Sequence, residues 1–393
     1  MIRKCLAILF ALLFVCLTVS SAGENKKTRV PDWLRSDKPV SSDQVRAEDY
    51  PYLVQWLDKH SKPSQEYMVR LFDTYQVVIL SEEHNVREHK DFVIDLIPKL
   101  YYEAGVRCIG WEFSPFTKNK RLEELISAPN YDEDEVLQFA RESDPDWNSK
   151  EHWEIIRAVW MLNKSLKPGR EKMRLIGLPC ELDPEYFVVY RTKPIASPEF
   201  QASSEFQDLV KQSIDYDTSM VQNVEKEIFQ KGHKGLVFVG LGHDWTEYRY
   251  PAEVNFGIDL KSMGNLLKER YGDRIFNVRT QCSADPSFVD QVMKRRNYER
   301  VGFNMQDSPF ANILVPVYRG APDVPWSRLT CGFIYLGPRT SLHSNTTIKG
   351  YVTKRMFEKY KEYYNVCFGN GRNFSSPEEV DEYLQQHRWP KPK

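Results

Sequence analysis

Short runs of β-branched and aliphatic residues, each bounded by glycine or polar residues, recur along the chain. Three of them cover residues 76–80, 107–111 and 235–240. Such runs are typical of buried strands in a parallel sheet. Between the first two, apolar positions three and four residues apart predict a helix over residues 86–104. The alternation predicts an α/β fold with a largely parallel central sheet flanked by helices.

The pattern along the rest of the chain divides it into three segments after the N-terminal 22 residues. We expect an N-terminal segment over residues 23–65, an α/β domain over 66–281 and a C-terminal extension over 282–393 that packs on the core. Pro98 predicts a kink or a break in the first helix. Residues 282–330 are rich in proline and are expected to be irregular. The further elements that we expect are a helical insertion at about 118–170, helices over 204–231 and 257–270, and strands over 173–178, 274–280 and 332–337.

The N-terminus has the pattern of a signal peptide. Arg3 and Lys4 precede an apolar run over residues 6–19, and small residues follow it. This predicts cleavage near Ala22, so residues 1–22 are a signal peptide and the mature chain is exported, to a periplasm or outside the cell. A lipoprotein anchor at Cys16 is disfavoured because a bulky valine precedes it. No transmembrane span is expected after cleavage.

Composition limits the partners and the redox chemistry. The chain has 393 residues, 41% hydrophobic and 28% charged, with a net charge of −1. It is therefore expected to be globular, with no nucleic-acid partner. Five cysteines remain after cleavage and none forms a Cys-x-x-Cys motif. Cys282, Cys331 and Cys367 can supply one disulfide in an oxidising compartment, but their spacing does not fix the pairing.

Acidic residues and histidines follow the three apolar runs directly. Glu82 and His84 follow the first run, Glu112 the second and His243 the third. In open α/β sheets the ligand crevice lies beyond the carboxyl ends of the strands, so these side chains are expected to converge in one cleft. A single His or Glu in such a place is more often a loop or cap residue. Three strand ends that each carry one favour an active site.

The chemistry expected of this cleft is general-base hydrolysis. A neutral His84 can take a proton from water, while Glu112 or Glu82 holds its tautomer. His243 can stabilise an oxyanion or protonate a leaving alkoxide. Because no Gly-x-Ser-x-Gly motif is present, we favour direct attack of water on an ester, lactone or amide of a small molecule. Arg87 and His89 are candidates for substrate binding, although both also fit a solvated helix face.

Three motifs resemble one superfamily, in the same order. Residues 80–89, Leu-Ser-Glu-Glu-His-Asn-Val-Arg-Glu-His, resemble the opening motif of the erythromycin-esterase-like, ChaN-like and Tiki-like proteins. Trp-Glu-Phe at 111–113 resembles the second motif, and Val-Gly-Leu-Gly-His at 239–243 the late Gly-x-Gly-His motif. The resemblance spans about residues 70–280 and implies the same α/β fold and Glu/His cleft. Ser81 and Thr246 depart from the pattern, which puts a macrolide substrate in doubt.

The branches of this superfamily imply two alternatives. The Tiki-like branch implies metal-assisted hydrolysis, for which His84, Glu112 and His243 are the candidate ligands of a divalent metal. The ChaN-like branch implies haem or iron uptake, with Tyr or His as the axial ligand. The sequence therefore predicts an exported esterase-like hydrolase, with a haem-binding uptake protein as the alternative.

Overall fold

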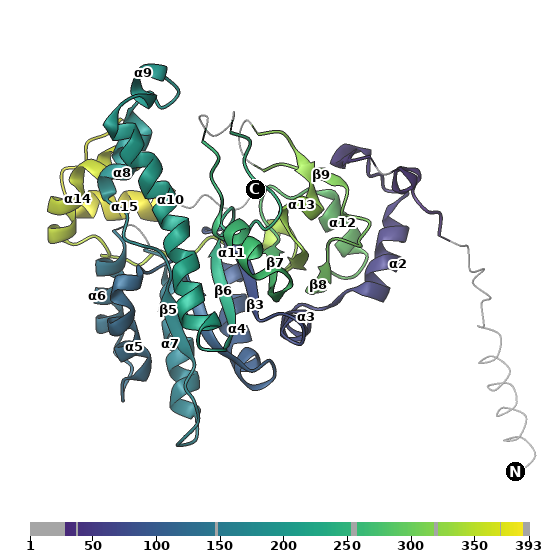
Figure 1. Ribbon diagram of the computed structural model, residues 1–393, viewed down its shortest axis with the longest axis horizontal. Coiled ribbons are helices and arrows are strands. Elements are labelled where there is room, and N and C mark those ends of the chain that lie inside the picture. The colour runs from purple at the N-terminus through teal and green to yellow at the C-terminus, as the bar shows by residue number, and fades with distance from the viewer. Residues whose placement is uncertain are drawn as a thin grey trace, which may run out of the picture.

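Eight strands form the central sheet of the computed structural model (Figure 1). In chain order they are β2 (Lys62–Pro63), β3 (Val77–Glu82), β4 (Val106–Trp111), β5 (Arg174–Gly177), β6 (Lys234–Gly240), β7 (Ile275–Thr280), β8 (Val301–Asn304) and β11 (Gly332–Tyr335). Their order across the sheet is β2-β8-β11-β7-β3-β6-β4-β5. The pairings from β5 through to β11 are parallel, and only β8 and β2 add antiparallel pairs. The predicted α/β class with a largely parallel sheet is confirmed.

The structure describes residues 28–36, 38–145, 148–252, 258–317, 321–369 and 371–387. The predicted signal peptide, including Cys16, lies outside these ranges. Among the helices within them, none is both long and apolar enough to cross a membrane. All five cysteines of the described chain are free thiols, so it contains no disulfide among Cys282, Cys331 and Cys367.

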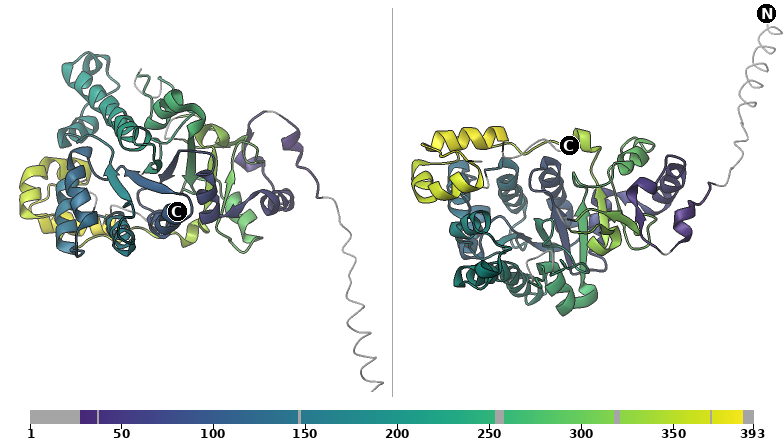
Figure 2. Two further views of the ribbon diagram at one scale, coloured as in Figure 1. Left: turned by 60° about the horizontal axis from the view of Figure 1, so that its bottom comes forward. Right: turned by 90° about the horizontal axis from the view of Figure 1, so that it is seen from above.

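Helices cover both faces of the sheet (Figure 2). They are α2 (Tyr50–His60), α3 (Ser64–Leu71), α4 (Arg87–Tyr102), α5 (Asn119–Ser127), α6 (Glu133–Ser143), α7 (Lys150–Ser165), α8 (Pro184–Thr192), α9 (Pro198–Gln201), α10 (Ser204–Val224), α11 (Met263–Tyr271), α12 (Phe288–Lys294), α13 (Trp326–Leu329), α14 (Lys354–Cys367) and α15 (Pro377–His387). The expected insertion at 118–170 corresponds to α5, α6 and α7. The expected break at Pro98 is absent, because α4 continues through it to Tyr102.

The central strand β3 shows why the apolar runs are continuous. Val77 and Ile79 pack with α10 and α11 on one face, and Val78 and Leu80 pack with α4 and α7 on the other. All four side chains are fully buried. A strand covered by helices on both faces needs apolar residues at every position, and this is the pattern of the sequence.

Residues after 281 take part in the sheet. β11 pairs in parallel with β7, and β8 pairs with β11 on one side and with β2 on the other. The expectation that residues 282–330 are irregular is wrong. They contain α12, β8, β9 (Ile313–Val315), β10 (Val324–Pro325) and α13. These elements are too short for sequence periodicity to show, and the core that they form with α2 fixes them instead.

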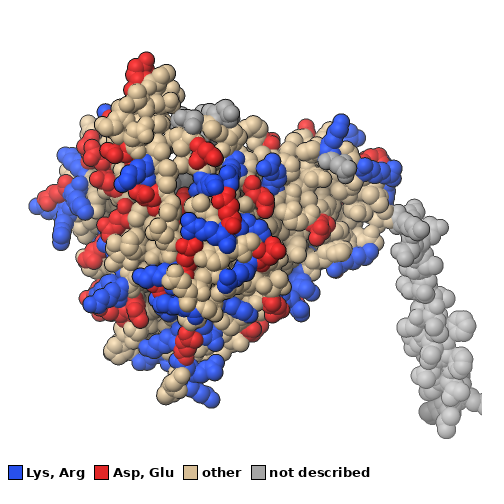
Figure 3. All heavy atoms as spheres, in the orientation of Figure 1, with Lys and Arg blue, Asp and Glu red and all other residues tan. Residues whose placement is uncertain are grey.

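A second, three-stranded sheet joins the N-terminal segment to residues 313–325. It has the order β1-β9-β10, with β1 (Val40–Ser41) parallel to β9. On the face drawn in Figure 3, basic and acidic side chains are intermixed rather than separated, in keeping with the net charge of −1. That face therefore presents no broad surface of one sign.

Candidate functional site

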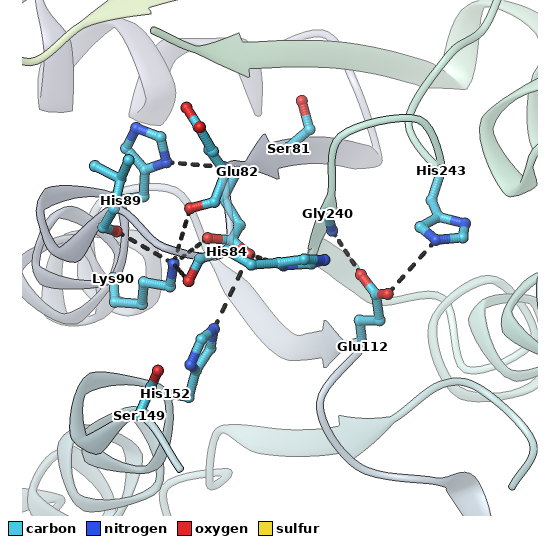
Figure 4. Close-up of polar contacts among 12 residues, drawn as sticks. Ser81, Glu82, His84, His89, Lys90, Glu112, Ser149, His152, Gly240 and His243 are labelled. Atoms are coloured by element: carbon cyan, nitrogen blue, oxygen red, sulfur yellow. Dashed lines mark hydrogen bonds and ion pairs between the residues drawn. The ribbon is translucent and has the colours of Figure 1, made fainter. Parts of the chain in front are cut away.

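The three predicted strand ends lie side by side. Glu82 ends β3 and is in register with Gly240, which ends β6. Glu112 follows β4, and its backbone N–H donates to the carbonyl of Phe238 in β6 at 3.2 Å. Glu82, His84, Glu112 and His243 are consequently brought to one edge of the sheet (Figure 4). This is the convergence that the sequence predicts.

His84 is oriented by Glu82. The Nδ1 atom of His84 contacts a carboxylate oxygen of Glu82, whose side chain is completely buried. About a third of the His84 side chain is exposed, and it lines a cavity of about 880 Å³. Nε2 lies above Gly240, next to the carboxylate of Glu112. Glu82 thus holds Nδ1, and the opposite side of the ring, with Nε2, lies toward Gly240.

Gly240 makes room for this imidazole. A Cβ atom at position 240 would lie 2.3 Å from Cε1 and 2.6 Å from Nε2 of His84. Those distances are far below van der Waals contact, so the ring would have to leave its place.

We therefore expect Gly240→Ala to lower any activity that depends on His84 by about tenfold or more, because a misplaced catalytic group loses its alignment. The clash also predicts a loss of stability that disappears in a His84→Ala background. A double-mutant cycle measured by thermal unfolding checks this coupling. Equal destabilisation in both backgrounds would show that the ring does not occupy the space above Gly240.

A buried lysine holds both Glu82 and the loop that carries His84. Lys90, on α4, has no exposed side-chain surface, and its ammonium contacts the second carboxylate oxygen of Glu82. It also donates to the backbone carbonyls of Glu83, His84 and Val86 at 3.1, 2.9 and 3.1 Å. Burial alone would raise the pKa of Glu82, but Lys90 and His84 outweigh it and hold that pKa well below its usual range. Burial lowers the pKa of Lys90, and the negative charge of Glu82 opposes that shift. Glu82 and Lys90 contact each other as a buried ion pair.

Glu112 and His243 form the second half of the site. Glu112 is almost fully buried; one carboxylate oxygen accepts from the Gly240 N–H at 2.6 Å and the other from the Tyr216 hydroxyl at 3.3 Å. Nε2 of His243 lies 3.5 Å from Glu112, and its Nδ1 lies 2.9 Å from Asp217 on α10. His243 is therefore placed between two carboxylates.

This placement fixes the charge of His243. Burial lowers the pKa of its imidazole, but Asp217 and Glu112 outweigh burial and raise that pKa to about 10. His243 is consequently an imidazolium at neutral pH. It can donate to a developing negative charge, but it cannot act as a base.

Two predicted substrate-binding residues serve the structure instead. His89 is fully buried; its Nδ1 accepts from the Glu83 N–H at 3.0 Å and its Nε2 donates to the Gln281 carbonyl at 2.8 Å. Burial lowers the pKa of His89 to about 3, so it is neutral. Nε of Arg87 lies 3.2 Å from a carboxylate oxygen of Glu151. Neither residue is among those that line the cavity: His89 is directed toward Glu83 and Gln281, and Arg87 toward Glu151 of α7.

A loop near the C-terminus closes over the His84 loop. The side-chain amide of Asn345 donates to the His84 carbonyl at 2.6 Å and to the Ser149 hydroxyl at 2.9 Å. The backbone N–H of Arg87 donates to the His343 carbonyl at 2.9 Å. The residues expected to form a C-terminal extension thus help to fix the candidate site.

The donor set does not fit a divalent metal well. Within the described residues, Glu82, His84 and His152 are the one acid-and-histidine group whose ligand atoms lie within 4.8 Å of one another. His152 is buried, and burial lowers its pKa to about 3. The ammonium of Lys90 already neutralises Glu82 and would repel a cation. The predicted ligand set of His84, Glu112 and His243 is not such a group among the described residues. Two carboxylates also hold His243 as a cation, which disfavours it as a metal ligand.

The described geometry can be compared with known proteins. No family model and no curated protein matches the chain. Solved structures do match. A succinoglycan biosynthesis protein matches with a TM-score of 0.55 and 12% identity over 78% of this chain and 100% of that protein. A Bacillus cereus protein matches with a TM-score of 0.54 and 12% identity over 76% of this chain and 99% of its own.

The third match names a fold. The erythromycin esterase EreC, in an open conformation, matches with a TM-score of 0.51 and 11% identity over 72% of this chain and 95% of its own. The chain has the fold of the erythromycin esterase. The resemblance drawn from the three sequence motifs is thereby confirmed for the fold. At such identities, an esterase-like fold defines the place of the cleft but not its substrate.

Sequence reasoning missed four residues of the site: Lys90, His152, Asp217 and Asn345. A charged residue inside the apolar face of a predicted helix was the available signal for Lys90, because such a residue is rarely buried without a partner. His152 and Asp217 lie on helices far from the strand-end motifs, so only the folded chain brings His152 close to Glu82 and Asp217 to the cavity.

Proposed function

We propose that this chain is an exported hydrolase that activates water with His84 against an ester, lactone or amide. The observation that carries the proposal is the orientation of His84: Glu82 holds Nδ1, and Nε2 lies beside Glu112 on a side chain that lines the cavity. An imidazole held in one tautomer by a buried carboxylate is the arrangement of a general base.

The neighbouring carboxylate completes a place for water. A water molecule between Nε2 of His84 and Glu112 has one acceptor for each of its two protons. Its free lone pair is then directed away from both, toward a bound carbonyl carbon. As the C–O bond forms, His84 takes one proton, and it later returns that proton to the leaving alkoxide or amine.

The imidazolium of His243 supplies the positive charge that the reaction needs. Addition of hydroxide to a carbonyl places negative charge on the carbonyl oxygen. A donor that is already fixed in place stabilises that charge without having to reorganise as the reaction proceeds. Asp217 keeps His243 charged and in place.

The experiment measures hydrolysis by the native chain and by His84→Ala. The probes are p-nitrophenyl acetate, p-nitrophenyl butyrate, a γ-lactone and a p-nitroanilide. We expect turnover by the native chain and a loss of about 10² to 10⁴-fold in the variant. His60→Ala, which alters an exposed histidine of α2, is the matched control. Absence of turnover on every probe, or full activity of a folded His84→Ala protein, would overturn the proposal.

Haem capture is the second candidate function. Tyrosine is a haem ligand type, and Tyr186, Tyr190 and Tyr363 all line the same cavity. Titration of the purified protein with haemin distinguishes the two functions. Haem binding would be indicated by saturable binding with a shifted Soret band that is lost when one of these tyrosines is substituted. Together with the absence of ester turnover, this result would favour haem capture over hydrolysis.

A further inference from the structure

One face of α10 runs along the whole cavity. Its residues recur at helical spacing of three and four, so their side chains point the same way. The six cavity-lining residues on this face are Phe206, Leu209, Val210, Ser213, Tyr216 and Asp217. We call this set the α10 stripe. At 1.5 Å of rise per residue, it spans about 16 Å.

The polarity of the α10 stripe changes from one end to the other. Asp217 and Tyr216 contact His243 and Glu112 at the catalytic end. Ser213, at mid-length, bonds the Tyr186 hydroxyl at 2.9 Å. Phe206 and Leu209, at the far end, are buried in an apolar cluster. A molecule lying along the stripe would thus meet polar groups at one end and hydrocarbon at the other.

Other elements contribute to the apolar part of the cavity. Tyr186 and Phe187 of α8 line the cavity, and Ile195 and Ile258 close its apolar part. The apolar cluster at this end is separate from the main cores of the sheet. A large cavity with one apolar end and a few convergent polar groups is typical of a site for an amphiphilic small molecule.

We propose that the α10 stripe binds an elongated apolar arm of the substrate, attached to the carbonyl that the His84 site attacks. The inference rests on the proposed function and specifies its substrate class as esters of medium to long acyl groups. The carbonyl lies at the Asp217 end and the hydrocarbon lies along Val210 and Leu209. Short esters leave the apolar end empty and are expected to be poor substrates.

The test measures kcat/KM on p-nitrophenyl acetate, butyrate, octanoate and laurate. We expect a rise of roughly two- to fourfold per methylene group, the gain from transferring a CH₂ group out of water. Val210→Trp places a large side chain in the apolar part of the cavity, so the rise from acetate to octanoate and laurate should be lost. Ile214→Trp, one turn further along α10, is the matched control, because Ile214 is 45% exposed and does not line the cavity. Rates that do not depend on chain length, or a Val210→Trp profile like that of the native chain, would overturn the inference.

A binding assay separates this inference from the proposed function. The probe is dansylamino-undecanoate methyl ester, mixed with the His84→Ala protein and followed by fluorescence. Binding that Val210→Trp abolishes and Ile214→Trp preserves supports the apolar subsite even if no ester is hydrolysed. Hydrolysis of p-nitrophenyl acetate without probe binding and without chain-length dependence would support the proposed hydrolase and contradict the apolar subsite.

Discussion

Replacing Lys90 with Met is expected to lower the free energy of unfolding by about 3–5 kcal/mol. The substitution keeps the length of the side chain but removes the ammonium that neutralises the fully buried Glu82. Three backbone carbonyls of the His84 loop lose their donor at the same time. A buried carboxylate without its counter-ion keeps the whole cost of its desolvation, and that cost dominates the expected loss.

Urea unfolding followed by circular dichroism measures this effect. Lys99→Met is the matched control, because Lys99 lies on the same helix but is 44% exposed and pairs with the exposed Glu103. It should change stability by less than about 1 kcal/mol. Adding Glu82→Gln to Lys90→Met removes the unpaired charge and should recover part of the loss. If Lys90→Met and Lys99→Met behave alike, the ion pair does not hold the loop together.

The strands and the residues at their carboxyl ends are the part of the site that the sequence alone predicts. Continuous apolar runs predict β3, β4 and β6, because strands covered on both faces need hydrocarbon at every position. The rule for carboxyl ends then brings Glu82, Glu112 and His243 together, as the register of β3 with β6 shows. The site is predictable to this extent because sheet topology alone positions these residues.

Residues held by tertiary contacts were beyond that reasoning. His89 lies in the first turns of the helix that follows the His84 loop, so the sequence made it a candidate for the cleft. In the fold, both of its ring nitrogens form hydrogen bonds, one with Glu83 and one with Gln281. Asp217 lies in the middle of a long amphipathic helix, where an acidic residue usually faces water. Only the packing of α10 against the strand ends turns Asp217 toward His243. The charge state of His243, and with it the division of roles between the two histidines, follows from that packing.

Asp217→Asn is expected to lower the pKa of His243 from about 10 toward its ordinary value of about 6.5. Asparagine keeps the shape and an oxygen that can accept from the Met263 N–H, so the main change is the loss of charge. In the native protein, the stabilisation from protonated His243 is complete below about pH 6.5 and is lost as pH rises toward 10. The variant loses this contribution at lower pH.

The effect on catalysis should follow the same titration. At pH 6 both proteins carry the imidazolium, and kcat/KM should differ by a few-fold at most. At pH 9 the native protein keeps its cation while the variant has lost it, so kcat/KM should fall by about 10²-fold, the usual effect of removing one oxyanion donor. Histidine titration by NMR measures the pKa directly and does not depend on any substrate. Asp215→Asn, at an exposed position of the same helix, is the control. If His243 of the variant titrates as in the native protein, Asp217 does not raise the pKa of this imidazole and Glu112 does. Glu112→Gln would then be the substitution that shifts the fall of kcat/KM at high pH.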